Sequence, residues 1–420
     1  MKYINVSFLK KLINASAFTN FLNLSSVQLY NTLLSFLIYP IILRKVGLEA
    51  FGLFIVANYF AALMAVLINY GTSQSGVKEV VMNGDNPSAL SRIFYNTLFL
   101  RAIIFISFLL VALPLGFSDI PSYKTYLFAL PLVLSEVLNP MFLYLGKEKL
   151  ALYNLSNFVG KIIAILAIIY LINATEDAIW VNFILGTVNT TTFVFLVVYA
   201  KFHYRLKFTI SKRPEIVKLF ISNFYLVGNN ISVQLQQSLM VFTINLWGDP
   251  LWLGTYSICD KIIGSVKMMI SYISYSFYPK TAQLFKEDRM LFINFKNQMK
   301  KILFLSFLTL SFGIMIFAGQ IIYLANGETN TSAETLLRVM AFLPAAAAIN
   351  SFNVLELLIL DKNIFIFRIA MILLLLSVCV SVPIALWGNL YWFGIYTLMI
   401  EISAVLMYEY VIRKNQHIVN

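Results

Sequence analysis

Long apolar runs that carry almost no charge follow one another along the whole chain, and they constrain its fold more than any other feature. Of the 420 residues, 60% are hydrophobic and only 12% are charged. A soluble domain carries about 25% charged residues, because water must solvate its outer faces. This chain has too little polar surface for that, so we expect lipid to surround most of its exterior.

Twelve runs are long enough to cross a bilayer, which takes about 20 mostly apolar residues, and they predict an all-α polytopic membrane protein. The first run follows three lysines, but it is too long for the apolar core of a signal peptide, so we interpret it as a span. Alternating charged and apolar residues over 280–301 predict an amphipathic helix at the membrane interface. The expected spans are 17–43, 51–71, 94–117, 122–145, 151–172, 178–200, 216–246, 251–277, 302–325, 333–359, 364–387 and 390–411.

The distribution of lysine and arginine predicts the orientation of these spans. With the N-terminus inside, the seven inside segments hold 22 of these residues, whereas the outside holds Arg44, Lys45 and Lys124. Cytoplasmic loops are enriched in Lys and Arg, so both termini are expected in the cytoplasm. The net charge of +12 then reflects topology, and we expect no nucleic-acid partner.

Short sequence matches recur between the two halves of the chain. Residues 26–29 (Ser-Val-Gln-Leu) in the first expected span recur as 232–235 in the seventh, 206 residues later. Residues 51–54 (Phe-Gly-Leu-Phe) in the second span resemble 253–256 (Leu-Gly-Thr-Tyr) in the eighth. Each match falls in an equivalent span, which indicates an internal repeat.

In a third match, Asn139 with Lys147 at the fourth span resembles Asn353 with Lys362 at the tenth. Six-span halves repeated in one orientation imply two bundles related by an axis along the membrane normal, an architecture of transporters. The sequence therefore predicts an N-terminal lobe over 1–205 and a C-terminal lobe over 206–420. Convergence on a shared apolar composition is the alternative explanation.

Amide side chains form a stripe on each of two repeat-related spans. The residues of the stripe on 216–246 fall within about 60° of arc at the helical rotation of 100° per residue, and those on 17–43 form a comparable face. Hydrogen bonds between helices, worth about 0.6 kcal/mol each, are one explanation, and a shared polar cavity is the one that we favour. The stripes consist of Asn20, Gln28 and Asn31 on 17–43, and of Asn223, Asn230, Gln234 and Gln237 on 216–246.

Several charged residues lie at membrane depth, where each costs at least about 2.5 kcal/mol and usually faces water or a partner. Glu136 and Lys161 lie in the fourth and fifth spans, so they are candidate partners. Asp260 and Lys267 share one face of the eighth span, and Lys261 points about 100° away. Charges nearer the span ends are interpreted as snorkelling to the interface; these are Arg101, Arg338, Glu356, Arg368 and Glu401.

The residues that membrane enzymes need are missing from the spans. Both histidines, His203 and His417, fall in basic cytoplasmic segments, and the sequence contains no GxxxxGK[ST] motif for ATP. The two cysteines, Cys259 and Cys379, lie in apolar runs and are interpreted as small core residues rather than metal ligands. We expect neither catalysis nor a metal or organic cofactor.

Several short motifs lie at the ends of the expected spans. They are Tyr70-Gly71, Ser75-Gly76-Val77-Lys78, Asn139-Pro140-Met141-Phe142, Gly146-Lys147-Glu148, Leu253-Gly254-Thr255-Tyr256-Ser257 and Pro279. With these motifs the chain resembles bacterial O-antigen and polysaccharide-unit flippases of the Wzx type, which belong to the multidrug/oligosaccharidyl-lipid/polysaccharide exporter superfamily. The resemblance covers essentially the whole chain.

The resemblance implies a V-shaped pair of bundles in the bacterial inner membrane. It also implies translocation of an undecaprenyl-pyrophosphate-linked glycan from the cytoplasmic to the periplasmic leaflet, with lipid and the polysaccharide polymerase machinery as further partners. Relatives tend to have a cationic cavity, whereas the first span here carries amides in place of arginine.

The hypothesis for the mechanism is alternating access. The amide stripes would bind sugar hydroxyls, and Lys161, Lys261 and Lys267 would attract the pyrophosphate. Glu136 or Asp260 would carry a coupling proton or sodium ion. The main alternative is a cation-coupled multidrug exporter of the same superfamily, which would need a cavity dominated by acidic residues, and a third is a non-transporting scaffold for glycan enzymes.

Overall fold

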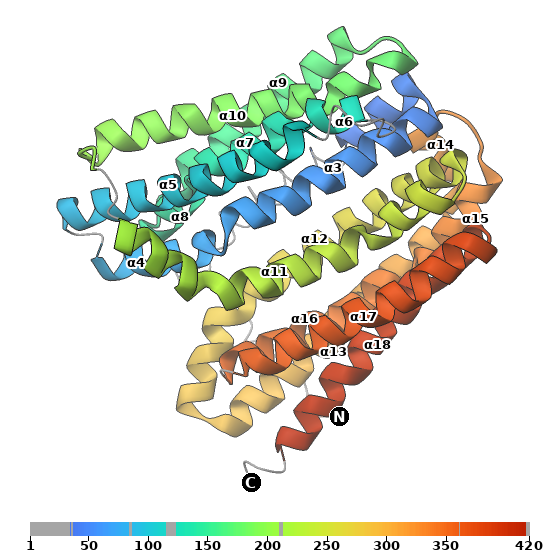
Figure 1. Cartoon of the computed structure of the whole chain (residues 1–420). Helices are drawn as coiled ribbons and strands as arrows, with labels where there is room; N and C mark the ends of the chain where they lie inside the picture. Colours follow the sequence, from blue (N-terminus) through green and yellow to red (C-terminus); the bar gives the residue numbers. More distant parts are fainter. Residues whose placement is uncertain are drawn as a thin grey trace.

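The computed structural model describes Leu34 and residues 37–83, 86–114, 123–209, 213–360 and 362–416, and in these parts helices are the only regular secondary structure (Figure 1). The first expected span, 17–43, lies outside the described residues except for its C-terminal end. Asn20, Gln28 and Asn31 of the first amide stripe lie outside them as well.

The helices of the N-terminal half follow the expected spans closely, although the fourth span is divided into three. A helix over 37–46 leads into the first labelled element. The helices are α3 (Leu48–Asn69), α4 (Thr72–Asn83), α5 (Pro87–Ala112), α6 (Tyr123–Phe128), α7 (Leu130–Leu138), α8 (Met141–Gly146), α9 (Leu150–Leu171), the 3₁₀ turn η2 (Thr175–Asp177) and α10 (Ala178–His203).

The helices of the C-terminal half are longer on average, and the tenth expected span is divided into two. They are α11 (Arg213–Trp247), α12 (Pro250–Glu287), α13 (Arg289–Ile316), α14 (Ala318–Asn326), α15 (Thr331–Met340), α16 (Leu343–Ile359), α17 (Asn363–Trp387) and α18 (Leu390–Gln416).

Local sequence explains where several of these helices begin. The side chain of Asn86 accepts hydrogen bonds from the backbone N–H groups of Ser88 and Ala89, and Pro87 occupies the first position of α5, where its missing N–H costs nothing. Asp288 caps α13 in the same way and ends α12. The prediction of one interfacial helix over 280–301 is therefore wrong: a cap at Asp288 divides this segment between two long helices.

Nine helices in the described residues are long and apolar enough to cross a membrane. A tenth candidate is α11, whose two segments, 213–224 and 226–247, are bent by 52°. The eighth expected span lies in α12, which is 38 residues long but is not among these candidates. Side chains on the outer faces include many large apolar ones, such as Leu110 and Tyr170, which suits a lipid environment. The chain is thus a multi-pass helical membrane protein, and twelve spans remain a prediction.

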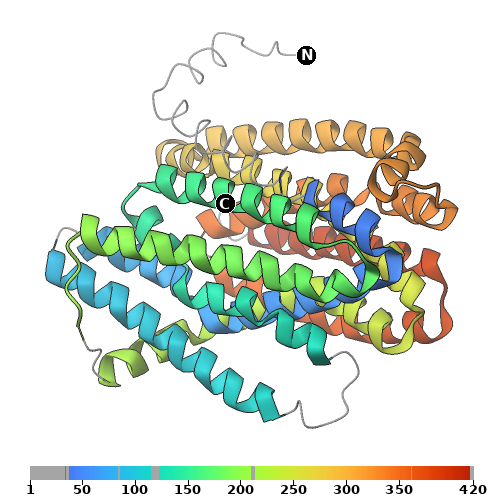
Figure 2. The same ribbon diagram turned by 90° about the horizontal axis from the view of Figure 1, so that it is seen from above.

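In Figure 1 the helices of the N-terminal half and helices α13–α18 lie on opposite sides of the molecule, with α11 and α12 between them, and Figure 2 shows the same helices from above. In the N-terminal half, α7 packs against α10 and α3, and α9 packs against α10. In the C-terminal half, α16 packs against α12, α13 and α18. The halves meet where α3 packs against α11 and α12.

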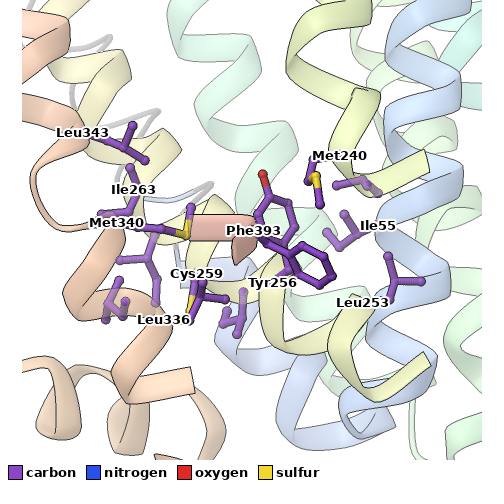
Figure 3. Close-up of a cluster of buried hydrophobic side chains, with 14 of the residues drawn as sticks. Ile55, Met240, Leu253, Tyr256, Cys259, Ile263, Leu336, Met340, Leu343 and Phe393 are labelled. Carbon is purple, nitrogen blue, oxygen red and sulfur yellow. The ribbon is translucent and has the colours of Figure 1, made fainter. Parts of the chain in front are cut away.

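One large apolar cluster crosses this junction (Figure 3). Ile55 of α3, Met240 of α11, Tyr256 of α12 and Phe393 of α18 are all buried in it. Cys259 is buried there too, as expected.

The second cysteine, Cys379, is exposed on α17, so its interpretation as a core residue is wrong. An apolar sequence context does not say whether a side chain meets protein or lipid.

Candidate functional site

The junction of α3 and α12 brings together a tyrosine, an acid and a lysine at membrane depth. The hydroxyl of Tyr59 on α3 donates a hydrogen bond to the Asp260 carboxylate on α12. The Lys261 ammonium lies 4.0 Å from the centre of the Tyr59 ring and 5.4 Å from that of Tyr39. A cation over an aromatic face is stabilised by the ring quadrupole. This cluster therefore links the two halves of the chain through charge as well as packing.

Two glycines allow α3 and α12 to approach this closely. A Cβ atom placed on Gly254 would lie 2.0 Å from the carbonyl oxygen of Leu48, and one placed on Gly52 would lie 2.9 Å from the backbone nitrogen of Gly254. Any side chain at Gly254 would force the helices apart. The matched motifs 51–54 and 253–256 thus touch each other across the junction.

Lys267, one of the predicted pyrophosphate ligands, is engaged in an ion pair. Its Nζ lies 2.5 Å from Oε2 of Glu401 on α18. The other oxygen of this carboxylate accepts a hydrogen bond of 2.9 Å from Asn350 on α16. Three helices of the C-terminal half meet at this point, and snorkelling is the wrong interpretation of Glu401.

Glu136 lies in a second polar junction, in the N-terminal half. Its carboxylate accepts hydrogen bonds from the amide groups of Asn69 and Asn139. Beside it, the guanidinium of Arg101 donates to the carbonyl oxygens of Glu136 at 3.0 Å and of Asn139 at 2.7 Å. The polar partners of Glu136 here are therefore on α3, α5 and the end of its own helix.

Arg101 is completely buried, so the prediction that it snorkels is wrong. The reason is the Asn139-Pro140 sequence, because α7 ends at Leu138 and Pro140 has no N–H to continue the helix. The carbonyl groups at a helix end need other donors, and the arginine supplies them. Asn-Pro inside an apolar run was the available sequence signal.

A third polar junction ties α13 to α16 and α18. Lys296 and Glu356 are both buried, with Nζ 2.7 Å from Oε2. Lys300 donates to Oδ1 of Asn353 at 2.7 Å and pairs with Glu409. Glu356 is therefore not a snorkelling residue either. The sequence gives no signal of this junction, because its lysines fall in a segment whose charges are typical of a cytoplasmic loop.

The amide stripe of 216–246 is only partly enclosed. Asn223 is buried and lies against the turn at Gly71, between α3 and α4. Asn230 and Gln234 are half-buried, and Gln237 is exposed.

The predicted site residues do not form one cluster. Lys161 is half-buried on α9, which packs against α8 and α10. Lys261 and Lys267 lie on α12, which packs against α3, α13 and α16. The described residues contain no group of three or more His, Cys, Asp or Glu side chains able to hold a metal ion.

Solved transporters share this fold. An inward-facing multidrug resistance MATE family transporter of the MOP superfamily matches with a TM-score of 0.72 and 16% identity, over 93% of this chain and 96% of that one. A MOP superfamily transporter from Pyrococcus furiosus, described as having a binding pocket of reversed polarity, matches with a TM-score of 0.69 and 14% identity, over 98% of each chain. The chain thus has the fold of these multi-pass membrane transporters.

The chain belongs to the family described as "Polysaccharide biosynthesis protein", whose profile matches residues 17–285. It is also 21% identical over 276 residues to the "Putative O-antigen transporter" of Escherichia coli (strain K12). That match spans 64% of this chain and 66% of the relative, just under two thirds of its length. These findings confirm the resemblance to polysaccharide-unit flippases that the sequence motifs indicate.

Proposed function

We propose that this protein moves a lipid-linked oligosaccharide, carried on undecaprenyl pyrophosphate, from the cytoplasmic to the periplasmic leaflet of the bacterial inner membrane by alternating access. The observation that carries the proposal is the family match over residues 17–285, which extends from the N-terminal half through α12. The polysaccharide polymerase machinery is the proposed partner that receives the unit on the far side.

We further propose that the moving parts are two six-helix lobes, 1–205 and 206–420, with both termini in the cytoplasm. The contact of Gly52 with Gly254 supports this arrangement, because equivalent positions of two repeats meet each other at a pseudo-two-fold axis. The matched asparagines each accept a hydrogen bond from a cation, Asn139 through its backbone carbonyl from Arg101 and Asn353 through its side chain from Lys300.

The amide stripes are the proposed ligands of sugar hydroxyls, and Lys161 and Lys261 are the proposed ligands of the pyrophosphate. Lys267 is less suited to that role, because the Glu401 carboxylate at 2.5 Å already neutralises its charge. Asp260 is the better candidate for proton or sodium coupling. Its hydrogen bond with Tyr59 crosses between the proposed lobes, so a change of its charge would act directly on their contact.

A cation-coupled multidrug exporter is the second candidate, and the shared fold with a MATE transporter favours it. Such a protein would need acidic side chains available to cationic drugs. Here Glu356 and Glu401 are held by lysines, and Glu136 is held by two amides beside Arg101. The charges are mixed rather than acidic, which supports the flippase.

Deletion of the gene, with the wild-type gene restored as a control, tests this proposal. We expect the deleted strain to lose surface polysaccharide and to accumulate the lipid-linked intermediate in its cytoplasmic leaflet. Increased sensitivity to cationic drugs with normal surface polysaccharide would instead establish the exporter.

A further inference from the structure

A groove of about 390 Å³ lies between α5 and α11, outside the polar junctions described above. Its lining includes Leu100, Ile103, Ile104 and Ser107 of α5, with Ile216 and Phe220 of α11. The residues of α5 follow one another at helical spacing and form one face. Ser107 is the polar exception, and its hydroxyl donates to the carbonyl oxygen of Ile103 at 2.9 Å. The Ser107 hydroxyl is therefore the one polar side-chain group in an otherwise apolar lining.

Contacts at two points hold the first segment of α11, residues 213–224, in place beside α5. Near the start of α11, Glu215 accepts a hydrogen bond of 2.9 Å from Asn96 and lies 3.8 Å from Arg92. Further along, the ring of Phe220 stacks on Tyr70 with 4.3 Å between centroids. The groove is thus part of the fold, and it lies where the two halves of the chain meet.

We propose that this groove holds the isoprenoid chain of the lipid-linked substrate, an inference that rests on the proposed function. The apolar lining suits a hydrocarbon chain, since removing each CH₂ group from water stabilises the bound state. The position of the groove between α5 and α11 puts a chain held there at the contact of the two proposed lobes.

Charge at one end of the groove supports the same occupant. Arg92 lies two helical turns, or about 12 Å, before Leu100 on α5, and its side chain is 61% exposed. Arg213 and Lys218 are exposed on the facing segment of α11. Two carboxylates lie among these cations: Glu215 is 3.8 Å from Arg92, and Glu79 is close enough to interact with Lys218 and Arg92. Three cations against two carboxylates leave an excess of positive charge that would attract a diphosphate, which carries more negative charge than the single phosphodiester of a phospholipid.

The test is binding of a long-chain polyprenyl pyrophosphate to the purified full-length protein, measured by native mass spectrometry. Ser107→Trp fills the groove and is expected to weaken binding at least tenfold. Ile106→Trp is the matched control, because Ile106 is 56% exposed on α5 and is not part of the lining; it should bind as the wild type does. Ile103→Ala, which only removes apolar contact, is expected to weaken binding about threefold, since about 0.65 kcal/mol corresponds to that factor.

Two other ligands show whether the groove recognises the isoprenoid chain. The same measurements distinguish failure of the groove proposal from failure of the proposed function. Inorganic pyrophosphate should bind the wild type and Ser107→Trp equally, because it has no chain. If phosphatidylglycerol binds as tightly as the polyprenyl lipid and loses the same factor in Ser107→Trp, the groove is a general lipid site and the proposal is overturned. Unchanged polyprenyl binding in both groove variants would overturn the groove alone. A wild type that binds no polyprenyl pyrophosphate would overturn the proposed function with it.

Discussion

Replacement of the buried arginine, Arg101→Met, is expected to destabilise the protein by about 3 kcal/mol. The guanidinium makes four hydrogen bonds: 2.7 Å to Thr72 Oγ1, 3.3 Å to Ser73 Oγ, and 3.0 and 2.7 Å to the carbonyl oxygens of Glu136 and Asn139. Methionine fills much of the same volume, but it removes the Arg101 donor from the Asn139 carbonyl oxygen and leaves the Glu136 carbonyl oxygen with only the 3.4 Å hydrogen bond from the Asn139 N–H. A buried polar group without a partner costs about 1–3 kcal/mol, and loss of a buried charge partner costs about 3–5 kcal/mol.

The expected value lies at the low end of that range because hydrogen bonds in membrane bundles are weak, about 0.6 kcal/mol on average. Arg101→Lys keeps the charge but loses the forked donor geometry. We therefore expect it to lower the free energy of unfolding by less than Arg101→Met does. The assay is equilibrium unfolding in mixed detergent micelles, followed by tryptophan fluorescence.

Arg338→Met is the matched control for this experiment. The Arg338 side chain is 51% exposed and lies 3.8 Å from Glu334 one turn away, a pair worth about 0.3–0.5 kcal/mol. If Arg101→Met unfolds at the same denaturant fraction as Arg338→Met, the carbonyl groups at the Asn139-Pro140 break have other partners and the reasoning is refuted.

Three further predictions address the junctions and the topology. Lys267→Ala should reduce surface polysaccharide, because it leaves Glu401 without its cation, and the double variant with Glu401→Gln should restore it. A double variant that stays inactive would instead support Lys267 as a ligand of the pyrophosphate. Gly254→Ala should abolish export of surface polysaccharide by separating α3 and α12, whereas Gly264→Ala, the control, has open space around it and should export normally. Equal export by the two variants would contradict the close packing of α3 against α12. An alkaline phosphatase fusion at Glu328 should be active, because that loop is predicted to be periplasmic, and a cytoplasmic result would reverse the orientation.

The sequence by itself determined that lipid surrounds most of this protein and that its spans are helical. Charge depletion excludes a soluble domain, and apolar runs set the helices, because the thickness of a bilayer fixes their length. Motifs such as Asn139-Pro140 and Leu253-Gly254 were enough to indicate the family that the comparisons then showed. These properties depend only on residues that are close together in the chain.

Only the tertiary structure decided which buried charges are partners. Glu136 was a candidate partner for Lys161, but its carboxylate accepts from Asn69 and Asn139. Lys267 pairs with Glu401, 134 residues away. Helical periodicity gives the face on which a residue lies, but it does not give the direction in which the helix is turned. That direction is set by packing against other helices, here by the glycine contact of α3 with α12 and by the bend of α11 toward α5.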